Sequence, residues 1–162
     1  MDKNKLTLRN IHDSDINLVS QWLYKDYILK WYNDADEWLN EIKERNATFR
    51  FLHHFIVSVN DKPIGFCQYY DCFDAKEEWY EVDESGKIYS IDYLIGEEEY
   101  LRKGYAKEII KRLTEKIKSY DKSEKIIVQP EEENIASCKA LLSSGFVYEE
   151  EKKYYLLMLN KQ

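Results

Sequence analysis

The chain has 162 residues, 44% hydrophobic and 15% aromatic, and this is enough apolar material for the core of one domain spanning residues 1–162. Its net charge of −7 argues against a nucleic-acid-binding protein, because neutralising phosphates requires a basic face, and makes a cationic small molecule the more natural partner. The N-terminus has no apolar run after its charges and no stretch approaches the roughly 20 apolar residues of a membrane span, so we expect a cytoplasmic protein without membrane association.

The first half of the chain predicts strands and helices in alternation. LTLRNI (residues 6–11) alternates apolar and polar side chains as a strand does, and Asp13 or Ser14 can cap the helix that follows it. A second helix is predicted for residues 34–44, after the aromatic loop or helix end ILKWYND. HHFIVSVN and PIGFCQYYDCF then form an antiparallel hairpin with a polar turn at residues 60–62. The acidic segment 74–87 predicts a long loop, and long loops in compact domains are often functional.

The second half predicts a buried strand with its helix, then a short strand, another helix and a terminal hairpin. KIYSIDYLI (residues 87–95) is apolar on both alternating faces except at Ser90 and Asp92, which indicates a central strand covered on both sides. The following segment predicts an amphipathic helix with Ala106, Ile109, Ile110, Leu113 and Ile117 on one face. A short strand follows in EKIIVQP, then a helix that starts at Asn134 or an adjacent acid, runs through Leu142 and is ended by Gly145, and then a terminal hairpin in FVYEEEKKYYLLML. Together the elements predict one α/β unit with a mixed sheet.

The junction IGEEEYLRKGYAKEII lacks an ordinary helix cap. Helix starts favour Ser, Thr, Asp or Asn and acidic side chains, yet Arg102, Lys103 and Gly104 stand here. A helix N-terminus binds anions through its free N–H groups, and a glycine lets a ligand come close to the backbone. The junction therefore predicts an anion site, with phosphate as the natural ligand. The alternative is that Arg102 and Lys103 are solvated and Gly104 only turns the chain.

Asp92 is the second unusual residue, because it is a carboxylate in an apolar central strand. Desolvation raises the pKa of such a group toward the range useful for proton transfer, so Asp92 is a candidate general base. The alternative is a structural carboxylate bonded to a neighbouring basic or tyrosine side chain.

These segments together resemble a known superfamily. LRKGYAKEIIKRL resembles the acyl-CoA-binding segment of the GCN5-related N-acetyltransferases, with pattern Q/R-x-x-G-x-G/A; Gly104 and Ala106 fit it and Leu101 departs from its first position. Over nearly its full length the chain resembles the aminoglycoside 6'-N-acetyltransferases, in the segments LTLRNIHDSDINLVSQWL, ILKWYND, KPIGFCQYY, EEWYE followed by IDYLIG, and NIASCKALLSSGF. Related siderophore-precursor acyltransferases share much of this pattern. The resemblance implies an α+β fold with a mixed, mostly antiparallel central sheet flanked by helices.

The resemblance also implies an activity and a cofactor site. It implies acetyl-CoA as cofactor, CoA as product, a monomer or homodimer, and the 6'-amine of an aminoglycoside antibiotic as the first candidate acceptor, with the cellular role, drug resistance or another, left open. It assigns the general-base role to Asp92, the pyrophosphate to the backbone N–H groups of residues 102–106, and the pantetheine arm to residues 93–95. The implied cofactor-binding residues are Tyr93, Leu94, Ile95, Arg102, Lys103, Gly104, Tyr105, Ala106 and Asn134.

The candidate acceptor site combines carboxylates with aromatic faces, which attract cationic amines by charge and by cation–π contacts of about 0.5–2 kcal/mol each. The candidate residues are Trp31, Tyr32, Gln68, Tyr69, Trp79, Tyr80, Glu81, Asp92 and Gln129. The alternative for the tract 77–84 is a solvated acidic loop whose aromatic side chains belong to the core. Trp22 also matches a family position near the acceptor cleft, although its place on an apolar helix face indicates a core residue.

Two positions depart from the family pattern. Leu141 stands where the superfamily commonly has the tyrosine that protonates the CoA thiolate, so the proton must come from water or from Tyr148, Tyr154 or Tyr155. Gln129 stands where the aminoglycoside enzymes have an aspartate that holds a substrate ammonium, and the glutamates at 131–133 lie nearby in sequence. These departures keep open an acyltransferase for a siderophore precursor, polyamine or peptide terminus, and a non-catalytic acyl-CoA-binding or drug-binding module.

The histidines and cysteines predict no metal site. His53 and His54 are adjacent in a strand, so their side chains face opposite ways and cannot chelate one metal together. The three cysteines are an odd number without CxxC spacing, and no histidine and third group stand in a pattern that would activate Cys67. We therefore expect reduced, packed thiols.

Overall fold

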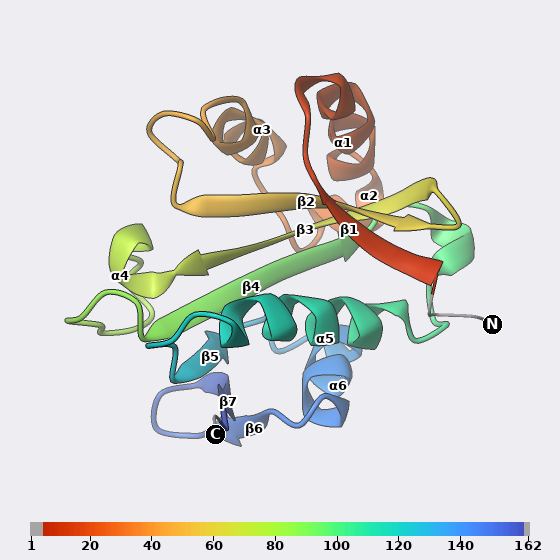
Figure 1. The fold of residues 1–162 in the computed structure, drawn as a ribbon. Coiled ribbons are helices and arrows are strands. Elements are labelled where there is room, and N and C mark those ends of the chain that lie inside the picture. Colours follow the sequence, from red (N-terminus) through yellow and green to blue (C-terminus); the bar gives the residue numbers. More distant parts are fainter. Residues whose placement is uncertain (1–4, 161–162) are drawn as a thin grey trace.

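The fold is built on one mixed sheet, seen in a computed structural model that describes residues 5–160 (Figure 1). Seven strands follow the order β1-β2-β3-β4-β5-β7-β6, and every neighbouring pair is antiparallel except β4 and β5. The strands are β1 (Leu6–Asn10), β2 (Leu52–Val59), β3 (Lys62–Asp71), β4 (Ile88–Ile95), β5 (Lys125–Val128), β6 (Val147–Glu149) and β7 (Tyr154–Met158). The predicted α+β class with a mixed, mostly antiparallel sheet is confirmed.

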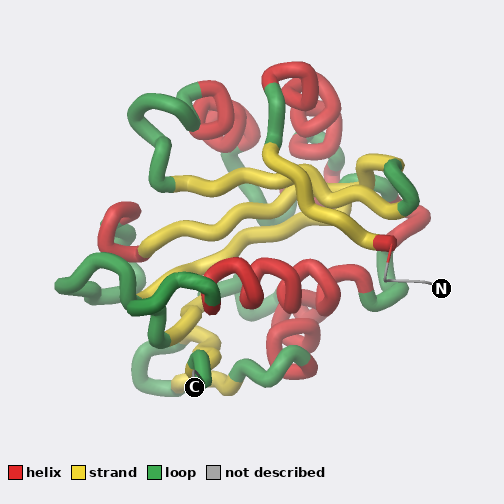
Figure 2. The backbone as a smooth tube through the Cα atoms, viewed as in Figure 1, coloured by secondary structure: helices red, strands yellow, loops and turns green. Residues whose placement is uncertain are grey.

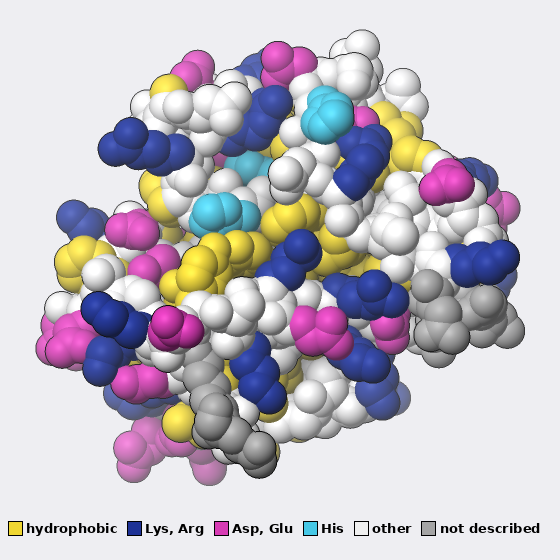
Figure 3. Space-filling model, viewed as in Figure 1, with side chains coloured by type: hydrophobic (Ala, Val, Ile, Leu, Met, Phe, Trp, Pro, Cys, Tyr) yellow, Lys and Arg dark blue, Asp and Glu magenta, His cyan; other side chains and the backbone are white. Residues whose placement is uncertain are grey.

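Helices cover both faces of the sheet (Figures 1 and 2). They are α1 (Ile16–Leu23), α2 (Asp26–Leu29), α3 (Ala35–Lys43), α4 (Cys72–Ala75), α5 (Tyr105–Lys118) and α6 (Ile135–Ser143). The buried side chains of α1 and α3 pack on Ile56, Phe66 and Leu94 on one face, and those of α5 pack on the alternate residues of the same strands on the other face. Within residues 5–160 no helix is long and apolar enough to cross a membrane. Acidic and basic side chains are interspersed on the face that carries α5 (Figure 3).

The first helix does not begin as predicted. A 3₁₀ turn, Asp13–Asp15, precedes α1, and no side chain caps the helix. The Asp15 carboxylate instead accepts the backbone N–H of His12 at 2.8 Å and pairs with both terminal nitrogens of Arg9 at 2.8 Å. The capping role expected of Asp13 or Ser14 is therefore wrong, because the turn ahead of the helix is organised around Asp15.

The predicted hairpin is formed by β2 and β3, with Asn60 and Asp61 in the turn at φ of 51° and 67°. Both central positions of a tight hairpin turn favour positive φ, which Asn and Asp tolerate better than most residues. The loop expected over residues 74–87 begins two residues later, because α4 takes the end of β3 into a single helical turn.

The predicted central strand is confirmed as β4, and the sheet splits between β4 and β5. It pairs with β3 along its whole length, from Tyr89 opposite Asp71 to Ile95 opposite Gly65. It pairs with β5 only through Ile88 and Tyr89. Beyond Tyr89 the two parallel strands diverge, which leaves one edge of β4 unpaired in the middle of the sheet.

The C-terminal elements follow the sequence prediction closely. The Asn134 side chain accepts the backbone N–H of Ser137 at 3.2 Å and so caps α6, and Gly145 ends that helix at φ 95°. The terminal strands β6 and β7 form the expected hairpin beside β5.

Candidate functional site

Two cavities meet where β4 and β5 diverge. The acidic cavity, of about 510 Å³, lies on the α3 side, and the helix-end cavity, of about 620 Å³, lies between β4, α5 and α6. Both are lined by Trp31, Tyr32, Tyr93, Asn134 and Ser137. The two cavities are therefore neighbours that share this wall.

The acidic cavity is named for its carboxylates. Glu37 and Glu41 come from α3, Asp92 from β4, and Glu77 and Glu131 from loops. Aromatic rings separate these acids around the wall, namely Trp31, Tyr32, Trp38, Phe49, Phe51, Tyr70, Trp79 and Tyr93. Carboxylates beside aromatic faces suit a cation carrying several amines.

Asp92 is half-buried in the wall of the acidic cavity. The Gln68 side-chain amide donates to Asp92 Oδ2 at 2.8 Å. Burial raises the pKa of Asp92 to about 6, the Gln68 hydrogen bond acts in the opposite direction, and the charge of Glu77 adds to the increase. At neutral pH the group is a carboxylate that is basic enough to exchange a proton with a bound ammonium.

Glu41 is a further acid of this cavity that the sequence analysis did not select. Burial first, and then the charges of Asp92, Glu37 and Glu77, raise its pKa to about 7. No described residue donates a hydrogen bond to its carboxylate. The signal in the sequence was the i, i+4 spacing of Glu37 and Glu41, which places two acids on the same side of one helix.

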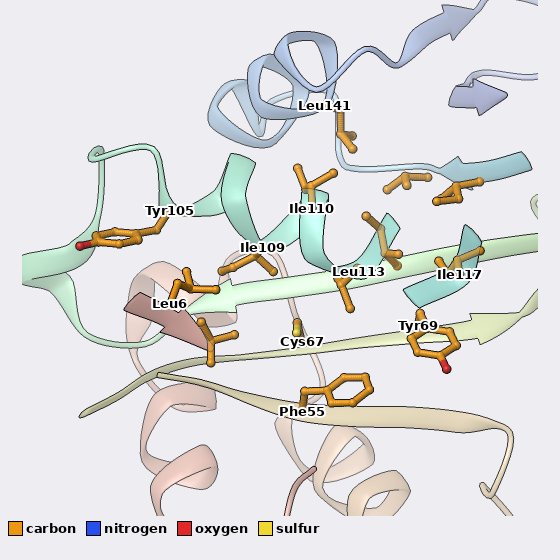
Figure 4. Close-up of a cluster of buried hydrophobic side chains, with 14 of the residues drawn as sticks. Leu6, Phe55, Cys67, Tyr69, Tyr105, Ile109, Ile110, Leu113, Ile117 and Leu141 are labelled. Carbon is orange, nitrogen blue, oxygen red and sulfur yellow. The ribbon is translucent and has the colours of Figure 1, made fainter. Parts of the chain in front are cut away.

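The structure brings six of the predicted acceptor residues to the acidic cavity and leaves three outside. Those inside are Trp31, Tyr32, Gln68, Trp79, Asp92 and Gln129. Tyr69 lies on the opposite face of β3, in the core under α5, where its hydroxyl bonds that of Tyr120 at 2.6 Å (Figure 4). Side chains alternate along a strand, so Tyr70 takes the place in the cavity that we expected for Tyr69.

Tyr80 and Glu81 also lie outside the cavity. The Tyr80 hydroxyl donates to the Cys72 carbonyl at 2.8 Å and accepts the Glu77 N–H at 3.1 Å, which braces the loop, whereas Glu81 is exposed. The Glu77 carboxylate, by contrast, lines the cavity and accepts hydrogen bonds from Trp79 and Tyr70. Trp22 is 1% exposed and packs against Gly96, where a Cβ atom would collide with its ring, so it is a core residue.

The helix-end cavity contains the uncapped start of α5. Gly104 has φ 82° and Arg102 has φ 61°, and no side chain caps the helix. Of the predicted cofactor-binding residues, Tyr93, Leu94, Ile95, Arg102, Gly104, Tyr105, Ala106 and Asn134 line the cavity. Lys103 is exposed outside it, and the cations that join Arg102 in the wall are Lys107 and Lys139.

The unpaired edge of β4 forms the floor of this cavity. The Gly96 N–H donates to Ile64 of β3 at 2.7 Å, so the carbonyls of Tyr93 and Ile95 point to the opposite, open edge. The hydroxyl of Tyr32 donates to the Tyr93 carbonyl, and that of Tyr27 donates to the Ile95 carbonyl at 2.9 Å. Tyr27 was not selected from the sequence, because nothing in its local pattern shows which strand edge it will reach.

Leu141, which stands where the superfamily commonly has a tyrosine, is a core residue with 0% exposure, and its side chain faces α5 (Figure 4). None of the three tyrosines considered as replacements lines the acidic or the helix-end cavity. Tyr148 and Tyr155 line a third cavity beside Gln129, and Tyr154 is buried. The shared wall carries the hydroxyls of Tyr32, Tyr93 and Ser137. The Tyr93 hydroxyl lies 2.8 Å from Ser137 Oγ, and burial raises its pKa to about 12, so it keeps its proton at neutral pH.

The histidines and cysteines lie as the strand pattern predicts. His53 is exposed and stacks on Tyr69, whereas His54 is buried and stacks on Phe66. Cys67 is buried in the core under α5, and burial raises the pKa of its thiol. Among residues 5–160 there is no cluster of three or more His, Cys, Asp or Glu side chains that could hold a metal ion.

Comparisons with known proteins identify the family of this chain. A family described as "Acetyltransferase (GNAT) domain" matches residues 12–154. Aminoglycoside N(6')-acetyltransferase type 1 of Klebsiella pneumoniae is 23% identical over 149 residues, covering 88% of this chain and 74% of the relative, and the same figures hold for the Serratia marcescens protein.

Solved structures share the fold. Aminoglycoside acetyltransferase AAC(6')-Ib in complex with coenzyme A has a TM-score of 0.81 at 21% identity, covering 94% of both chains. Spermidine N-acetyltransferase from Vibrio cholerae, in complex with CoA and spermine, has a TM-score of 0.74 at 18% identity, covering 96% of both chains.

Proposed function

The chain belongs to the acetyltransferase (GNAT) domain family and is an acetyl-CoA-dependent N-acetyltransferase, and we propose that its acceptor is a primary amine of a polycationic small molecule, with the 6'-amine of an aminoglycoside as first candidate. The observation that carries this proposal is the junction of the two cavities, where an acid-lined acceptor side meets a cationic helix end. We propose that residues 1–162 form a single N-acetyltransferase domain.

The helix-end cavity fits the cofactor of the family. The start of α5 offers backbone N–H groups at the positive end of a helix, with Arg102, Lys107 and Lys139 around it, which suits a pyrophosphate. The diverging edge of β4 offers alternating backbone groups to an extended amide-containing arm. When bound, acetyl-CoA supplies an acetyl group activated as a thioester.

Asp92 acts on the acceptor. An ammonium cannot attack a carbonyl, because its nitrogen has no free electron pair, so the acceptor must first lose a proton. We assign that proton to the Asp92 carboxylate, directly or through one water, and the pKa of about 6 keeps this group ionised at neutral pH. Edge N–H groups of β4 can polarise the acyl carbonyl, and the Tyr93 and Ser137 hydroxyls can donate to the leaving sulfur.

The carboxylates of the acidic cavity support an acceptor with several positive charges. Glu41, Glu77 and Asp92 line different parts of one wall, so an acceptor with several separated ammonium groups gains more than a monoamine. Aminoglycosides and polyamines both have this property. The polyamine stays a second candidate because Gln129 supplies no charge and donates to the Lys153 carbonyl at 3.0 Å.

A thiol-release assay with acetyl-CoA tests the proposal. The panel comprises aminoglycosides that carry a 6'-amine, matched compounds that carry a 6'-hydroxyl, linear polyamines, lysine analogues hydroxylated on the side-chain amine as siderophore precursors, and a control without amine. We expect turnover with the 6'-amines and none with the matched 6'-hydroxyl compounds. Turnover with polyamines alone would make a polyamine, and not an aminoglycoside, the acceptor. Acetyl-CoA binding without turnover of any amine in the panel would contradict the proposed acceptor class.

A further inference from the structure

Three polar side chains form a row across the centre of the sheet. His54 of β2 lies directly opposite Gln68 of β3, and Gln68 lies directly opposite Asp92 of β4. Directly opposed residues of antiparallel strands place their side chains on the same face, with Cβ atoms about 4.5–5.5 Å apart. The row therefore runs on the α3 side of the sheet and ends at Asp92 in the acidic cavity.

The two inner members of the row are buried, and their hydrogen-bonding capacity is incompletely used. His54 is 4% exposed and Gln68 is 2% exposed. Neither imidazole nitrogen of His54 has a hydrogen-bond partner among the described residues, nor has Oε1 of Gln68. The other end of the Gln68 amide is engaged, because its Nε2 donates to Asp92. A donor and an acceptor of complementary type thus stand side by side without partners, at positions where such groups are normally paired.

We propose that His54 is a positioning residue that donates an imidazole N–H to Gln68 Oε1, directly or through one water, and thereby holds the Gln68 amide N–H on Asp92. The inference rests on the role given to Asp92 in the proposed function. A flipped Gln68 amide would turn its oxygen toward the Asp92 carboxylate, and two acceptors repel each other. A donor on the far side of the amide selects the productive orientation.

His54 is suited to this role because it stays neutral. Burial, and then the charges of Arg45 and His53, lower its pKa to about 4, while the neighbouring Gln68 amide acts in the opposite direction. Near neutral pH its ring therefore carries one N–H donor. A neutral His54 adds no positive charge next to Gln68. It therefore affects Asp92 only by fixing the orientation of the Gln68 amide. The ionisable groups that influence Asp92 or are influenced by it are Glu41, Glu77, Tyr32, Tyr70, Cys72 and Tyr93.

The consequence is a definite pH effect. The Gln68 N–H stabilises the charged form of Asp92 and lowers its pKa against the effect of burial. If the amide loses its orientation, the pKa of Asp92 rises, and the acid limb of the kcat/KM profile moves to higher pH. A merely structural loss would lower activity at every pH without moving that limb.

The test compares His54→Leu and Gln68→Leu, singly and together, with His53→Leu as the matched control on the other face of the same strand. We expect both single variants to move the acid limb upward by about one pH unit, which is about tenfold in kcat/KM well below the limb. The double variant should move it no further than Gln68→Leu, and His53→Leu should leave it in place. Additive shifts, or an unmoved limb in His54→Leu beside a shifted one in Gln68→Leu, would overturn the inference.

Two further measurements separate this inference from the proposed function. The imidazole ¹⁵N shifts of His54 in the full chain should change in Gln68→Leu, and those of His53 should not, without any substrate present. His54→Asn, which restores an N–H donor, should recover the wild-type acid limb even if His54→Leu folds poorly. Unchanged ¹⁵N shifts would defeat the His54 contact, whereas full turnover by Asp92→Asn would defeat the base assignment and leave the contact standing.

Discussion

The acidic cavity and the helix-end cavity share a wall but are built from different parts of the chain. The helix-end cavity depends on backbone: the start of α5, the positive φ of Gly104 and the unpaired edge of β4. The acidic cavity depends on side chains that come from α3, α4 and α6, from strands β2 to β5, and from the loops between these elements. The helix start in the first cavity is a local construction, whereas the carboxylates of the second cavity come together from segments far apart in sequence.

This difference fits the partners that we propose for the two cavities. A backbone site recognises a constant anionic group and tolerates change in the surrounding side chains, since N–H groups belong to every residue except proline. A side-chain site can be altered one residue at a time. Substitutions should therefore separate the two cavities cleanly, with backbone changes acting on cofactor affinity and carboxylate changes acting on the acceptor.

The largest effect should come from Asp92→Asn, which removes the proposed base and keeps its volume. We expect kcat to fall by about 10²–10⁴, in line with the loss of a general base, with little change in the KM for acetyl-CoA. Steady-state kinetics at saturating acceptor measure this. Glu81→Gln is the matched control, because Glu81 is an exposed carboxylate outside the cavity, and it should keep the wild-type kcat. Full turnover by Asp92→Asn at neutral pH would show that the assignment is wrong.

Gly104→Ala should damage the other cavity. Gly104 has φ 82°, where a Cβ atom costs about 1–2 kcal/mol, and the helix start must shift to relieve it. We expect the KM for acetyl-CoA to rise about tenfold, with the acceptor KM within about twofold of wild type. Gly86→Ala provides the control, since Gly86 also has φ 82° but lies in the β3–β4 loop, where a Cβ atom would face Lys122 beyond the C-terminal end of α5 and not the helix start. Equal effects of both variants on the acetyl-CoA KM would show that general strain, and not the helix start, is responsible.

Most of the fold, and the helix-end cavity, could be predicted because their signals are local. The uncapped junction at residues 102–104, the apolar alternation of β4 and the Asn134 cap can each be recognised within a few residues. The acidic cavity was predicted less completely, because whether a residue lines it depends on which face of its strand packs toward a helix that is distant in sequence. Tyr69 and Tyr70 show this: they are adjacent and chemically alike, and only the register of β3 decides which one enters the cavity.

Glu41 was missed for the same reason, and it offers a finer test of the acidic cavity. With a pKa of about 7, Glu41 is charged at pH 8 and largely protonated at pH 6, so its attraction for an ammonium weakens as the pH falls. We expect Glu41→Gln to weaken acceptor binding about fivefold at pH 8 and much less at pH 6. Titration calorimetry across this range measures it, with Glu44→Gln as the control, because Glu44 is an exposed carboxylate at the end of the same helix and outside the cavity. A pH-independent loss would mean that Glu41 acts by shape and not by charge.

The smallest effect is on stability, and it has the opposite sign. The pKa of Glu41 rises from 4.5 to about 7 on folding, so between these values the folded chain binds more protons than the unfolded chain, and stability is lost as the pH rises through this window. Glu41→Gln removes that loss. We expect the variant to match wild type below about pH 4.5 and to exceed it by about 1 kcal/mol at pH 8, a value reduced for partial solvent screening. Urea unfolding at the two pH values measures the difference. A variant that binds the acceptor less tightly but unfolds less readily would show that the acidic cavity trades stability for recognition, whereas equal stability at pH 8 would mean that Glu41 is solvated and carries no such cost.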